Sequence, residues 1–313
     1  PIKLLNNLIC GINMQKYLIV GPASQMLGVK IANKLSIPHI NTEFKRFPDG
    51  ENYLRLNLED ETILEGKEII IVQSTGPSAS RNQNARLIEL FIMIDAVKRI
   101  GVAKIILVIP YLAYARQDKI FRPGESEFAK VVLQMINSME IDELFVVDIH
   151  NPAVLEELTC KAVNIDSMKI LADYIKSLGA KDIVVVSPDK GAIERSKAFA
   201  KHFGEDIPVD FYEKKRDVKT GDITMSGKLS LKNKDVVIAD DIIATGGTMS
   251  KAIKISKENG ANKVYAAATH ALMLQNAKYR MLAAGGDEII GTDSIDNEVS
   301  KISLANVISD YLK

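Results

Sequence analysis

The chain has 313 residues, of which 47% are hydrophobic and 26% are charged, and its 40 Lys and Arg residues balance 40 Asp and Glu residues. This composition excludes a disordered chain, and at about 150 residues per domain the length indicates two domains. A formal net charge of zero gives no reason to expect a nucleic acid or an anionic membrane as a partner. No apolar run approaches the roughly 18 residues that cross a bilayer, and Cys10 and Cys160 lack the spacing of a disulfide framework or metal site. We therefore expect a cytoplasmic protein.

The N-terminal stretch is apolar but lacks the cationic start and the small-residue cleavage site of a targeting peptide. We therefore expect residues 1–13 to be an N-terminal extension. The first strand of the folded part follows at residues 17–21, so the first domain begins near Met14.

Short β-branched runs then alternate with amphipathic stretches along nearly the whole chain. Continuous apolarity is typical of strands that are buried on both faces of a parallel sheet, and apolar residues at helical spacing indicate the covering helices. This alternation predicts α/β sheets in which helices flank mainly parallel strands. The further strands are expected at residues 68–73, 104–110, 144–148, 182–187, 235–239 and 263–269, and helices at 86–100, 127–139 and 250–258.

Two segments interrupt this alternation. Residues 41–58 and 209–229 are extended and rich in turn residues, which predicts β-ribbons or loops that project from the sheets. Between them, a division near residue 155 separates two comparable halves. We expect one domain at residues 14–155, completed by a C-terminal helix at about 298–313, and a second domain at residues 156–297.

Residues 236–248 carry the clearest chemical signal. A buried strand ends in two adjacent carboxylates, Asp240 and Asp241, and a Thr-Gly-Gly-Thr loop then opens a helix. In parallel α/β sheets, ligands bind at the carboxyl ends of the strands. The glycines let backbone N–H groups approach a phosphate, and the carboxylates are suited to accept from sugar hydroxyls. The pattern predicts a site for a phosphorylated sugar, and a capping turn with solvated acids is the structural alternative.

Two motifs of the first half carry groups that suit a nucleotide. Residues 46–51 read Arg-Phe-Pro-Asp-Gly-Glu and place an aromatic ring beside two acids, with an ordinary Pro-Asp-Gly turn as the alternative. Residues 110–119 follow a strand and supply Arg116, Gln117 and Asp118. Arginine is a natural planar partner of phosphate oxygens, whereas a surface salt-bridge cluster is the alternative for this second motif.

Together these motifs resemble the ribose-phosphate pyrophosphokinase family, also called phosphoribosyl-diphosphate synthetases. The loop at residues 236–248 is shared with phosphoribosyltransferases, but the segments around Asp49 and Arg116 are not. The resemblance runs from about Tyr17 to the C-terminus and is nearer to the archaeal branch. It implies two phosphoribosyltransferase-like domains and an enzyme of nucleotide biosynthesis. The implied reaction transfers the diphosphate of ATP to the C1 hydroxyl of ribose 5-phosphate, with Mg²⁺ as cofactor, AMP as product and self-association to a dimer or higher oligomer.

The resemblance also assigns roles to individual residues. The motif at residues 46–51 would contact adenine, at a site shared between subunits, and the motif at 110–119 would hold the nucleotide phosphates. Both His150 and Asp189 follow strands and are implied to lie near Mg²⁺, with a structural histidine and a helix start as the alternatives. The implied ATP-binding residues are Phe47, Asp49, Glu51, Arg116, Gln117, Asp118 and His150, and the implied metal contacts are His150 and Asp189. The implied ribose 5-phosphate contacts are Asp240, Asp241, Thr245, Gly246, Gly247 and Thr248.

Residues 212–222 form a polar stretch with a basic cluster, which suits a lid over the reacting phosphates. Lys214 and Arg216 match a Lys-x-Arg pattern of the family and are implied to be catalytic cations that stabilise the transferring phosphoryl group. A solvated charged hairpin is the alternative for this segment.

The sequence contains no Gly-x4-Gly-Lys-Ser/Thr motif, so the chain does not resemble a P-loop kinase. Two other functions remain as alternatives, a phosphoribosyltransferase and a non-catalytic regulatory paralogue. The two α/β halves and residues 116–118 argue against the first. The presence of Asp189, Lys214 and Arg216 argues against the second.

Overall fold

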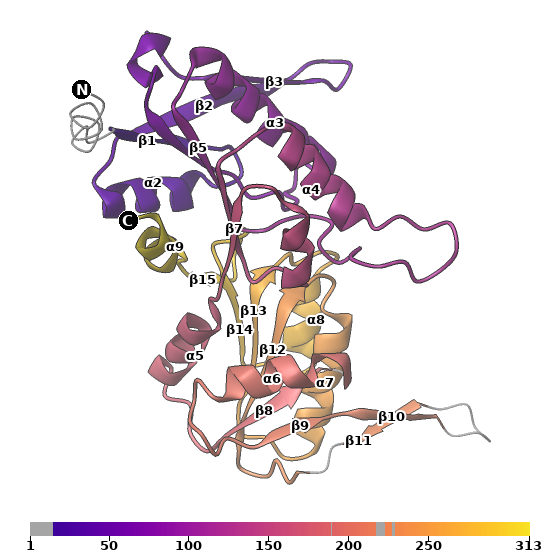
Figure 1. The fold of residues 1–313 in the computed structure, drawn as a ribbon. Coiled ribbons are helices and arrows are strands. Elements are labelled where there is room, and N and C mark those ends of the chain that lie inside the picture. Colours follow the sequence, from indigo (N-terminus) through magenta and orange to yellow (C-terminus); the bar gives the residue numbers. More distant parts are fainter. Residues whose placement is uncertain (1–14, 189, 217–222, 227–228) are drawn as a thin grey trace, which may run out of the picture. The chain divides into compact units, whose positions relative to one another are not determined.

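The fold is given by a computed structural model that describes residues 15–188, 190–216, 223–226 and 229–313 (Figure 1). The extension expected at residues 1–13 lies outside the described residues. The chain divides into two compact units. Unit 1 comprises the residues up to Val146 with Ala153–Val163 and Ile308–Lys313, and unit 2 comprises Val147–Pro152 and Asn164–Val307.

A seven-stranded sheet forms the centre of unit 1, in the order β3-β2-β1-β4-β5-β6-β7. The strands from β2 to β6 are parallel, whereas β3 is antiparallel to β2. These strands are β1 (Lys16–Val20), β2 (His39–Arg46), β3 (Asn52–Leu56), β4 (Glu68–Val72), β5 (Lys104–Ile109), β6 (Glu143–Val147) and β7 (Lys161–Ile165). The helices are α2 (Gln25–Leu35), α3 (Gln83–Ile100) and α4 (Phe128–Ser138), with 3₁₀ turns η2 (Glu61–Leu64) and η3 (Pro152–Glu157).

The central strands of this sheet are apolar without alternation because both of their faces are covered. Residues 69–72 of β4 are fully buried, which is typical of a strand between two helical layers. Helix α3 follows β4 after a loop and begins behind Asn82, whose side chain accepts from the backbone N–H of Ala85 at 2.9 Å. It ends at Gly101, which adopts φ +80°.

Unit 2 contains a second, six-stranded parallel sheet, in the order β15-β14-β13-β12-β8-β9, and a two-stranded antiparallel hairpin of β10 and β11. Its strands are β8 (Ile183–Ser187), β9 (Val209–Phe211), β10 (Glu213–Arg216), β11 (Ile223–Ser226), β12 (Asp235–Ile243), β13 (Val264–Ala271), β14 (Glu288–Thr292) and β15 (Ser300–Ile302). Its helices are α5 (Met168–Ser177), the 3₁₀ turn η4 (Lys190–Ala192), α6 (Ile193–Ala200), α7 (Gly247–Glu258) and α8 (Ala277–Ala283), and α9 (Ala305–Leu312) follows.

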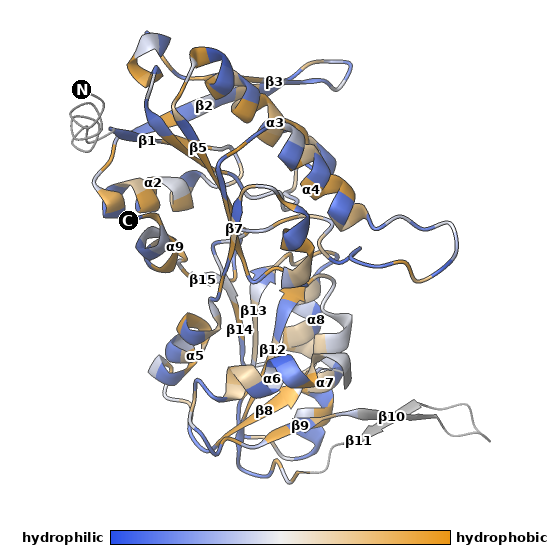
Figure 2. Ribbon diagram, in the orientation of Figure 1, coloured by the Kyte–Doolittle hydropathy of each residue, from blue (hydrophilic) through white to orange (hydrophobic). Residues whose placement is uncertain are grey.

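Alternate residues of the strands in unit 2 pack against different pairs of helices. On one face, Val184 and Ile238 belong to a buried cluster with side chains of α7 and α8. On the other face, Val185 and Val237 pack with side chains of α5 and α6. The hydrophobic character of β8 is visible in Figure 2. This two-sided burial fixes β12, whose carboxyl end carries the predicted sugar site, in the middle of the sheet.

The predicted fold class is confirmed: both sheets are mainly parallel and are flanked by helices. Residues 41–58 form an antiparallel ribbon of β2 and β3, as expected. The predicted helix at about 298–313 is wrong in its first part, because Ser300–Ile302 pairs with β14 and the helix begins only at Ala305. None of the helices in the described residues is long and apolar enough to cross a membrane.

Candidate active site

Asp240 and Asp241 lie near the carboxyl end of β12, between β8 and β13. The strand itself orients both carboxylates. The backbone N–H of Asp241 donates to Asp240 Oδ1 at 2.9 Å, and that of Ile242 donates to Asp241 Oδ1 at 3.0 Å. The side chain of Asp240 is 23% exposed and that of Asp241 only 6%. Asp240 is therefore the more accessible member of the pair.

Two nitrogen groups from other elements contact this acidic pair. Arg195 of α6 places one atom, Nη1, 2.7 Å from Asp240 Oδ1 and 2.6 Å from Asp241 Oδ1. His150 Nδ1 lies 2.5 Å from Asp241 Oδ2. Both oxygens of Asp241 are thus engaged by the protein. In the described part of the chain, Oδ2 of Asp240 has no such partner.

The two acids differ in their protonation. Burial and the adjacent Asp241 carboxyl raise the pKa of Asp240 to about 7, although Arg195 opposes this shift. Burial also tends to raise the pKa of Asp241, but the hydrogen bonds from His150 and Asp240 and the charge of Arg195 hold it below its ordinary value. Asp241 is therefore the more acidic member of the pair, and Asp240 is the member that takes up a proton first as the pH falls.

The two glycines of the loop after β12 differ in their surroundings: Gly246 is closely packed, whereas Gly247 faces open space. Gly246 adopts φ +69°, and a Cβ there would lie 3.2 Å from Cβ and 3.3 Å from the carbonyl oxygen of Ala277. At Gly247, the nearest atom to a Cβ would be Thr245 Oγ1, at 3.9 Å. Among the described residues, no side chain caps the first turn of α7. The loop therefore leaves N–H groups and open space for an anion on the side of Gly247.

The segment at residues 147–152 brings His150 to the acidic pair and is held by buried hydrogen bonds within unit 2. The Asp148 carboxylate accepts from Ser167 Oγ and from Thr269 Oγ1, both at 2.5 Å. Burial raises the pKa of Asp148 despite these donors. Asp148 adopts φ +37°, a conformation that non-glycine residues seldom occupy, so these bonds stabilise a bend that the chain would otherwise avoid.

His270 supports the same segment from the core. Its Nε2 lies 3.0 Å from the carbonyl oxygen of Val147, and its Nδ1 lies 3.0 Å from Ser294 Oγ. Because a carbonyl oxygen can only accept, Nε2 carries the proton. Burial lowers the pKa of His270 to about 4. At neutral pH it is therefore a neutral donor to the backbone next to Asp148.

Phe47, Asp49 and Glu51 gather at the tip of the β2–β3 hairpin. The N–H of Phe47 donates to the carbonyl oxygen of Glu51, and the N–H of Gly50 donates to that of Phe47, both at 2.9 Å. Gly50 adopts φ +101°, and the Glu51 N–H donates to Asp49 Oδ1 at 3.1 Å. The structural alternative, a Pro-Asp-Gly turn, is therefore present. The same turn also exposes the ring and both acids together.

The second group of nucleotide candidates lines another cavity of unit 1. Arg116 and Gln117 share a cavity of about 620 Å³ with Gln83 and with aromatic side chains that include Phe121. Asp118 follows them and is half-buried. Glu51 instead lines a cavity of about 730 Å³. The first turn of α3 contributes to both cavities, so the six ATP candidates of unit 1 do not converge on one cavity. The seventh candidate, His150, belongs to unit 2.

The basic candidates are only partly described. Lys214 and Arg216 occupy alternate positions of β10, which pairs with β11 in the register Lys214 to Met225 and Arg216 to Ile223. This hairpin agrees with the extended segment expected around residue 212. Asp189 lies outside the described residues.

No group of three His, Cys, Asp or Glu side chains suited to a metal ion occurs within the described ranges. The acidic pair nevertheless fits a divalent cation, because the buried carboxylate of Asp241 and the partly exposed carboxylate of Asp240 already share one positively charged group, the Arg195 guanidinium. Magnesium prefers oxygen ligands and keeps several waters, so few protein ligands are needed.

Three residues of this site were not predicted from the sequence. Arg195 had a single signal, the need of two adjacent buried acids for a counter-charge from an element at the same sheet edge. Asp148 is close to His150 in the sequence, and only His150 was a candidate there. No sequence feature indicated that Asp148 would be buried. His270 is the fully buried end of a strand and gave no signal of contact with residue 147.

The fold and the β12 loop define a protein of the phosphoribosyltransferase-type α/β class. Residues 155–304 match the phosphoribosyl transferase domain, and residues 17–139 match the N-terminal domain of ribose phosphate pyrophosphokinase. The ribose-phosphate pyrophosphokinase of Pyrococcus furiosus is 39% identical over 94% of this chain and 100% of its own length. That of Methanosarcina acetivorans is 37% identical over 95% of this chain and 99% of its own.

A solved structure agrees with these relatives. The phosphoribosylpyrophosphate synthetase from Mycobacterium smegmatis is 28% identical and superposes with a TM-score of 0.84, covering 95% of this chain and 97% of that one. The chain belongs to the ribose-phosphate pyrophosphokinase family, and it is a transferase, as the motifs predicted. Both quoted relatives are archaeal, which agrees with the branch that the sequence indicated.

Proposed function

We propose that the chain transfers the diphosphate of ATP to the C1 hydroxyl of ribose 5-phosphate and releases AMP. Family membership supports this reaction. The structural observation that carries it is the end of β12, where the partly exposed Asp240 and the buried Asp241 lie beside a glycine loop that is open at Gly247. In this proposal, residues 156–297 form the domain that binds ribose 5-phosphate, and residues 14–155 with the C-terminal helix form the ATP side.

The sugar phosphate would bind with its 5-phosphate in the loop from Thr245 to Thr248. The N–H groups of the first turn of α7 and the threonine hydroxyls then donate to the phosphate oxygens. The ribose hydroxyls are donors, and they meet acceptors at Asp240 and Asp241. The accessible Oδ2 of Asp240 offers the first acceptor, whereas Asp241 becomes available when its present donors rearrange.

Arg195 is the group that must rearrange. Its Nη1 lies between Asp240 and Asp241, where the hydroxyls of the sugar would bind. A guanidinium displaced by the sugar would find new acceptors on the diphosphate, because arginine pairs well with phosphate oxygens. Arg195 would then link occupation of the sugar site to binding of the group that is transferred.

The chemistry needs no nucleophile from the protein. The C1 oxygen forms a bond to the β-phosphorus of ATP, and the bond from that phosphorus to the α–β bridging oxygen breaks. AMP leaves with the electron pair, and the hydroxyl proton passes to water. Phosphoryl transfer depends mainly on positioning and on neutralisation of charge on the equatorial oxygens. We propose Lys214 and Arg216 as the catalytic cations for that charge.

We further propose Mg²⁺ as the cofactor, with Asp189 and His150 near it. His150 has one ring nitrogen directed at Asp241, so it would reach a metal or phosphate only through its other nitrogen. Bound Mg²⁺ would offset the charge of the nucleotide phosphates. Asp189 would hold the ion, and His150 would keep Asp241 charged beside it.

Self-association is part of the proposal, because the ATP candidates fall into two groups. Phe47, Asp49 and Glu51 expose adenine-binding groups at one hairpin, while Arg116, Gln117 and Asp118 follow β5. A site shared between copies would combine a hairpin from one with the phosphate-binding residues of another. Sedimentation of the purified protein would detect the dimer or higher oligomer that this requires. We also propose a cytoplasmic location, since both substrates are phosphorylated metabolites.

One assay separates the candidate functions. The purified protein is incubated with Mg²⁺, ATP and ribose 5-phosphate, and the products are followed by phosphorus NMR. Formation of AMP and of a C1 diphosphate ester, dependent on both substrates, supports the proposal. In a second reaction the C1 diphosphate ester is supplied in place of ATP and ribose 5-phosphate, and release of diphosphate only when a nucleobase is added would indicate a phosphoribosyltransferase. An inactive oligomer that activates a catalytic relative would indicate a regulatory paralogue.

A further inference from the structure

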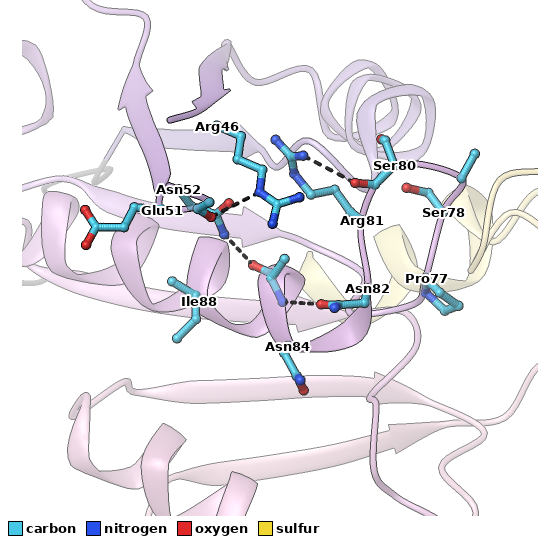
Figure 3. A pocket seen from close by; sticks show the side chains of 13 residues that line it. Arg46, Glu51, Asn52, Pro77, Ser78, Ser80, Arg81, Asn82, Asn84 and Ile88 are labelled. Carbon is cyan, nitrogen blue, oxygen red and sulfur yellow. Dashed lines mark hydrogen bonds between the residues drawn. The ribbon is translucent and has the colours of Figure 1, made fainter. Parts of the chain in front are cut away.

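The largest cavity among those described in unit 1 lies under the β2–β3 hairpin, against the loop that precedes α3 (Figure 3). Its volume is about 730 Å³. The substrate-binding roles proposed above involve only one of its lining residues, Glu51. The Glu51 carboxylate points away from the Arg46 guanidinium in Figure 3.

Two arginines enter this cavity from different elements. Arg46 comes from the end of β2, and its Nε donates to the carbonyl oxygen of Gly50 at 3.1 Å. Arg81 comes from the loop, where its Nε donates to Glu89 Oε1 at 3.1 Å and its Nη1 donates to the carbonyl oxygen of Ser80 at 3.3 Å. Figure 3 shows both guanidinium groups extending into the same space. Both Nη atoms of Arg46 and Nη2 of Arg81 are without an acceptor among the described residues.

The loop wall of the cavity adds a hydroxyl donor. Ser78 Oγ accepts from Nη2 of Arg86 at 3.2 Å, so its own proton is free to be donated elsewhere. Only 6% of the surface of Arg86 is exposed, and its Nη1 donates to Glu89 Oε2 at 2.9 Å. A rigid, charged group therefore fixes the oxygen of Ser78, and this favours donation into the cavity.

Positive charge exceeds negative charge around the cavity. The single buried carboxylate of Glu89 neutralises part of the charge of both Arg81 and Arg86. Arg46 makes no ion pair with any described residue. Two guanidinium groups that face one space repel each other unless an anion lies between them. The cavity thus has spare donors and a surplus of cations, which is the complement of a group whose oxygens only accept.

The cavity also has an apolar part and room for more than an ion. Ile88 of α3 is 47% exposed and lines it together with Pro77 and Ala85. Pockets of about 300–1,000 Å³ are typical for small organic ligands. A phosphate ester could therefore place its phosphate on the arginines and its organic part on Ile88.

We propose that this cavity binds a phosphate group, free or as a small phosphate ester, through Arg46, Arg81 and Ser78. The site goes beyond the proposed function, because the nucleotide phosphates were assigned to Arg116 and Gln117 in the other cavity. It is a separate anion site of unit 1.

The test is calorimetric titration of the full chain in which the substrate sites are already filled. Ribose 5-phosphate and Mg²⁺ with α,β-methylene ATP, whose α–β bond is not cleaved, are present at saturation. Inorganic phosphate is titrated in one arm and phenyl phosphate in the other. We expect a further site, and Arg46→Gln should weaken it by about tenfold or more, the effect of losing a charge-assisted hydrogen bond. Ser78→Ala should weaken it less and leave the Arg81–Glu89 pair intact.

Arg55→Gln is the matched control, because Arg55 lies on the same hairpin, pairs with Glu43 at 3.3 Å and does not line this cavity. Tighter binding of phenyl phosphate than of phosphate would identify an ester as the ligand, and the reverse would identify the free ion. Absence of a further site in the unmodified chain, or equal affinities in Arg46→Gln and Arg55→Gln, would overturn the proposal. Formation of AMP from ATP is measured separately, so failure here leaves the proposed reaction untouched.

Discussion

His150 Nδ1 lies 2.5 Å from Asp241 Oδ2, although 91 residues separate the two in the chain. The sequence motifs had assigned them to different substrates, the histidine to the nucleotide and the acid to ribose. Their contact lies within unit 2 and makes His150 a donor to one of the proposed ribose-binding acids. Any effect of His150 on the nucleotide would therefore come with an effect on the sugar site.

We expect His150→Ala to lower kcat/KM for ribose 5-phosphate by about 10- to 100-fold, since a hydrogen bond to a charged group contributes roughly 1.5–3 kcal/mol. Loss of this bond also removes one cause of the lowered pKa of Asp241. The acidic limb of the pH profile should therefore move to higher pH. Steady-state kinetics from pH 3 to 8, a range that includes the ordinary pKa of an aspartate, would measure both effects, with His39→Ala, on the exposed start of β2, as the control. An unmoved limb together with an unchanged kcat/KM would show that the contact has no functional role.

The two loop glycines provide a matched pair of substitutions. Gly246→Ala places a side chain at φ +69° and within 3.2 Å of Ala277, so we expect the free energy of unfolding to fall by about 1–3 kcal/mol. Gly247→Ala meets no atom closer than 3.9 Å and should leave stability unchanged or slightly higher. Its methyl group would instead occupy the space proposed for the 5-phosphate, and we expect KM for ribose 5-phosphate to rise tenfold or more.

Urea denaturation and initial-rate kinetics on both variants would test this division. The assignment of the loop fails if Gly247→Ala binds ribose 5-phosphate as well as the unmodified chain. It also fails if the two variants lose stability equally, because the open side of Gly247 would then be no different from the packed side of Gly246.

The sheets were predictable because their strands are buried on both faces. The run at residues 68–73 is apolar throughout, and a continuous run of this kind leaves few alternatives to a central strand. The start of the C-terminal segment was not predictable in the same way. Ser300–Ile302 is too short to show a periodicity, and its pairing with β14 depends on a partner distant from any local signal.

The candidate site was predictable to the extent that its chemistry is local. Asp240, Asp241 and the loop glycines adjoin one another in the sequence, so one motif contained them. Arg195 reaches Asp240 from a helix 45 residues earlier, and no spacing rule connects the two. The same holds for Asp148 and Thr269, which are 121 residues apart and meet only in the folded unit 2, where both are buried. Contacts of this kind are products of the tertiary fold.

Strand β10 carries both a proposed catalytic lysine, Lys214, and a lysine that can serve as its control, Lys215. Lys214 and Arg216 occupy alternate strand positions with Lys215 between them. We expect Lys214→Ala to reduce kcat by about 100-fold or more with a smaller change in KM, as for loss of a preorganised group that acts on transition-state charge. Lys215→Ala should leave kcat within about twofold, because it fills the variable position of the Lys-x-Arg pattern. A near-normal kcat for Lys214→Ala in single-turnover measurements would remove that residue from the mechanism.

His270 predicts a specific dependence of stability on pH. Burial lowers its pKa in the folded chain to about 4, below the 6.5 of an exposed histidine. Below pH 6.5, His270 is protonated in the unfolded chain but stays neutral in the folded chain. The free energy of unfolding therefore falls with pH until the pH reaches about 4. The contribution of His270 to the free energy of unfolding is fully present above pH 6.5. It is lost on acidification, and the total loss is about 3 kcal/mol for this difference in pKa.

His270→Gln removes the titrating ring and retains a side-chain donor for the carbonyl oxygen of Val147. We expect this variant to be less stable than the unmodified chain at pH 7.5, because the fit in the core is poorer. Between pH 6.5 and 4, however, it should lose less unfolding free energy than the unmodified chain, by about 3 kcal/mol. Urea titrations at half-unit pH steps would give the two curves, and His39→Gln, on the exposed start of β2, should follow the unmodified chain. Parallel curves for His270→Gln and the unmodified chain would mean that His270 is protonated in the folded state, with both ring nitrogens donating.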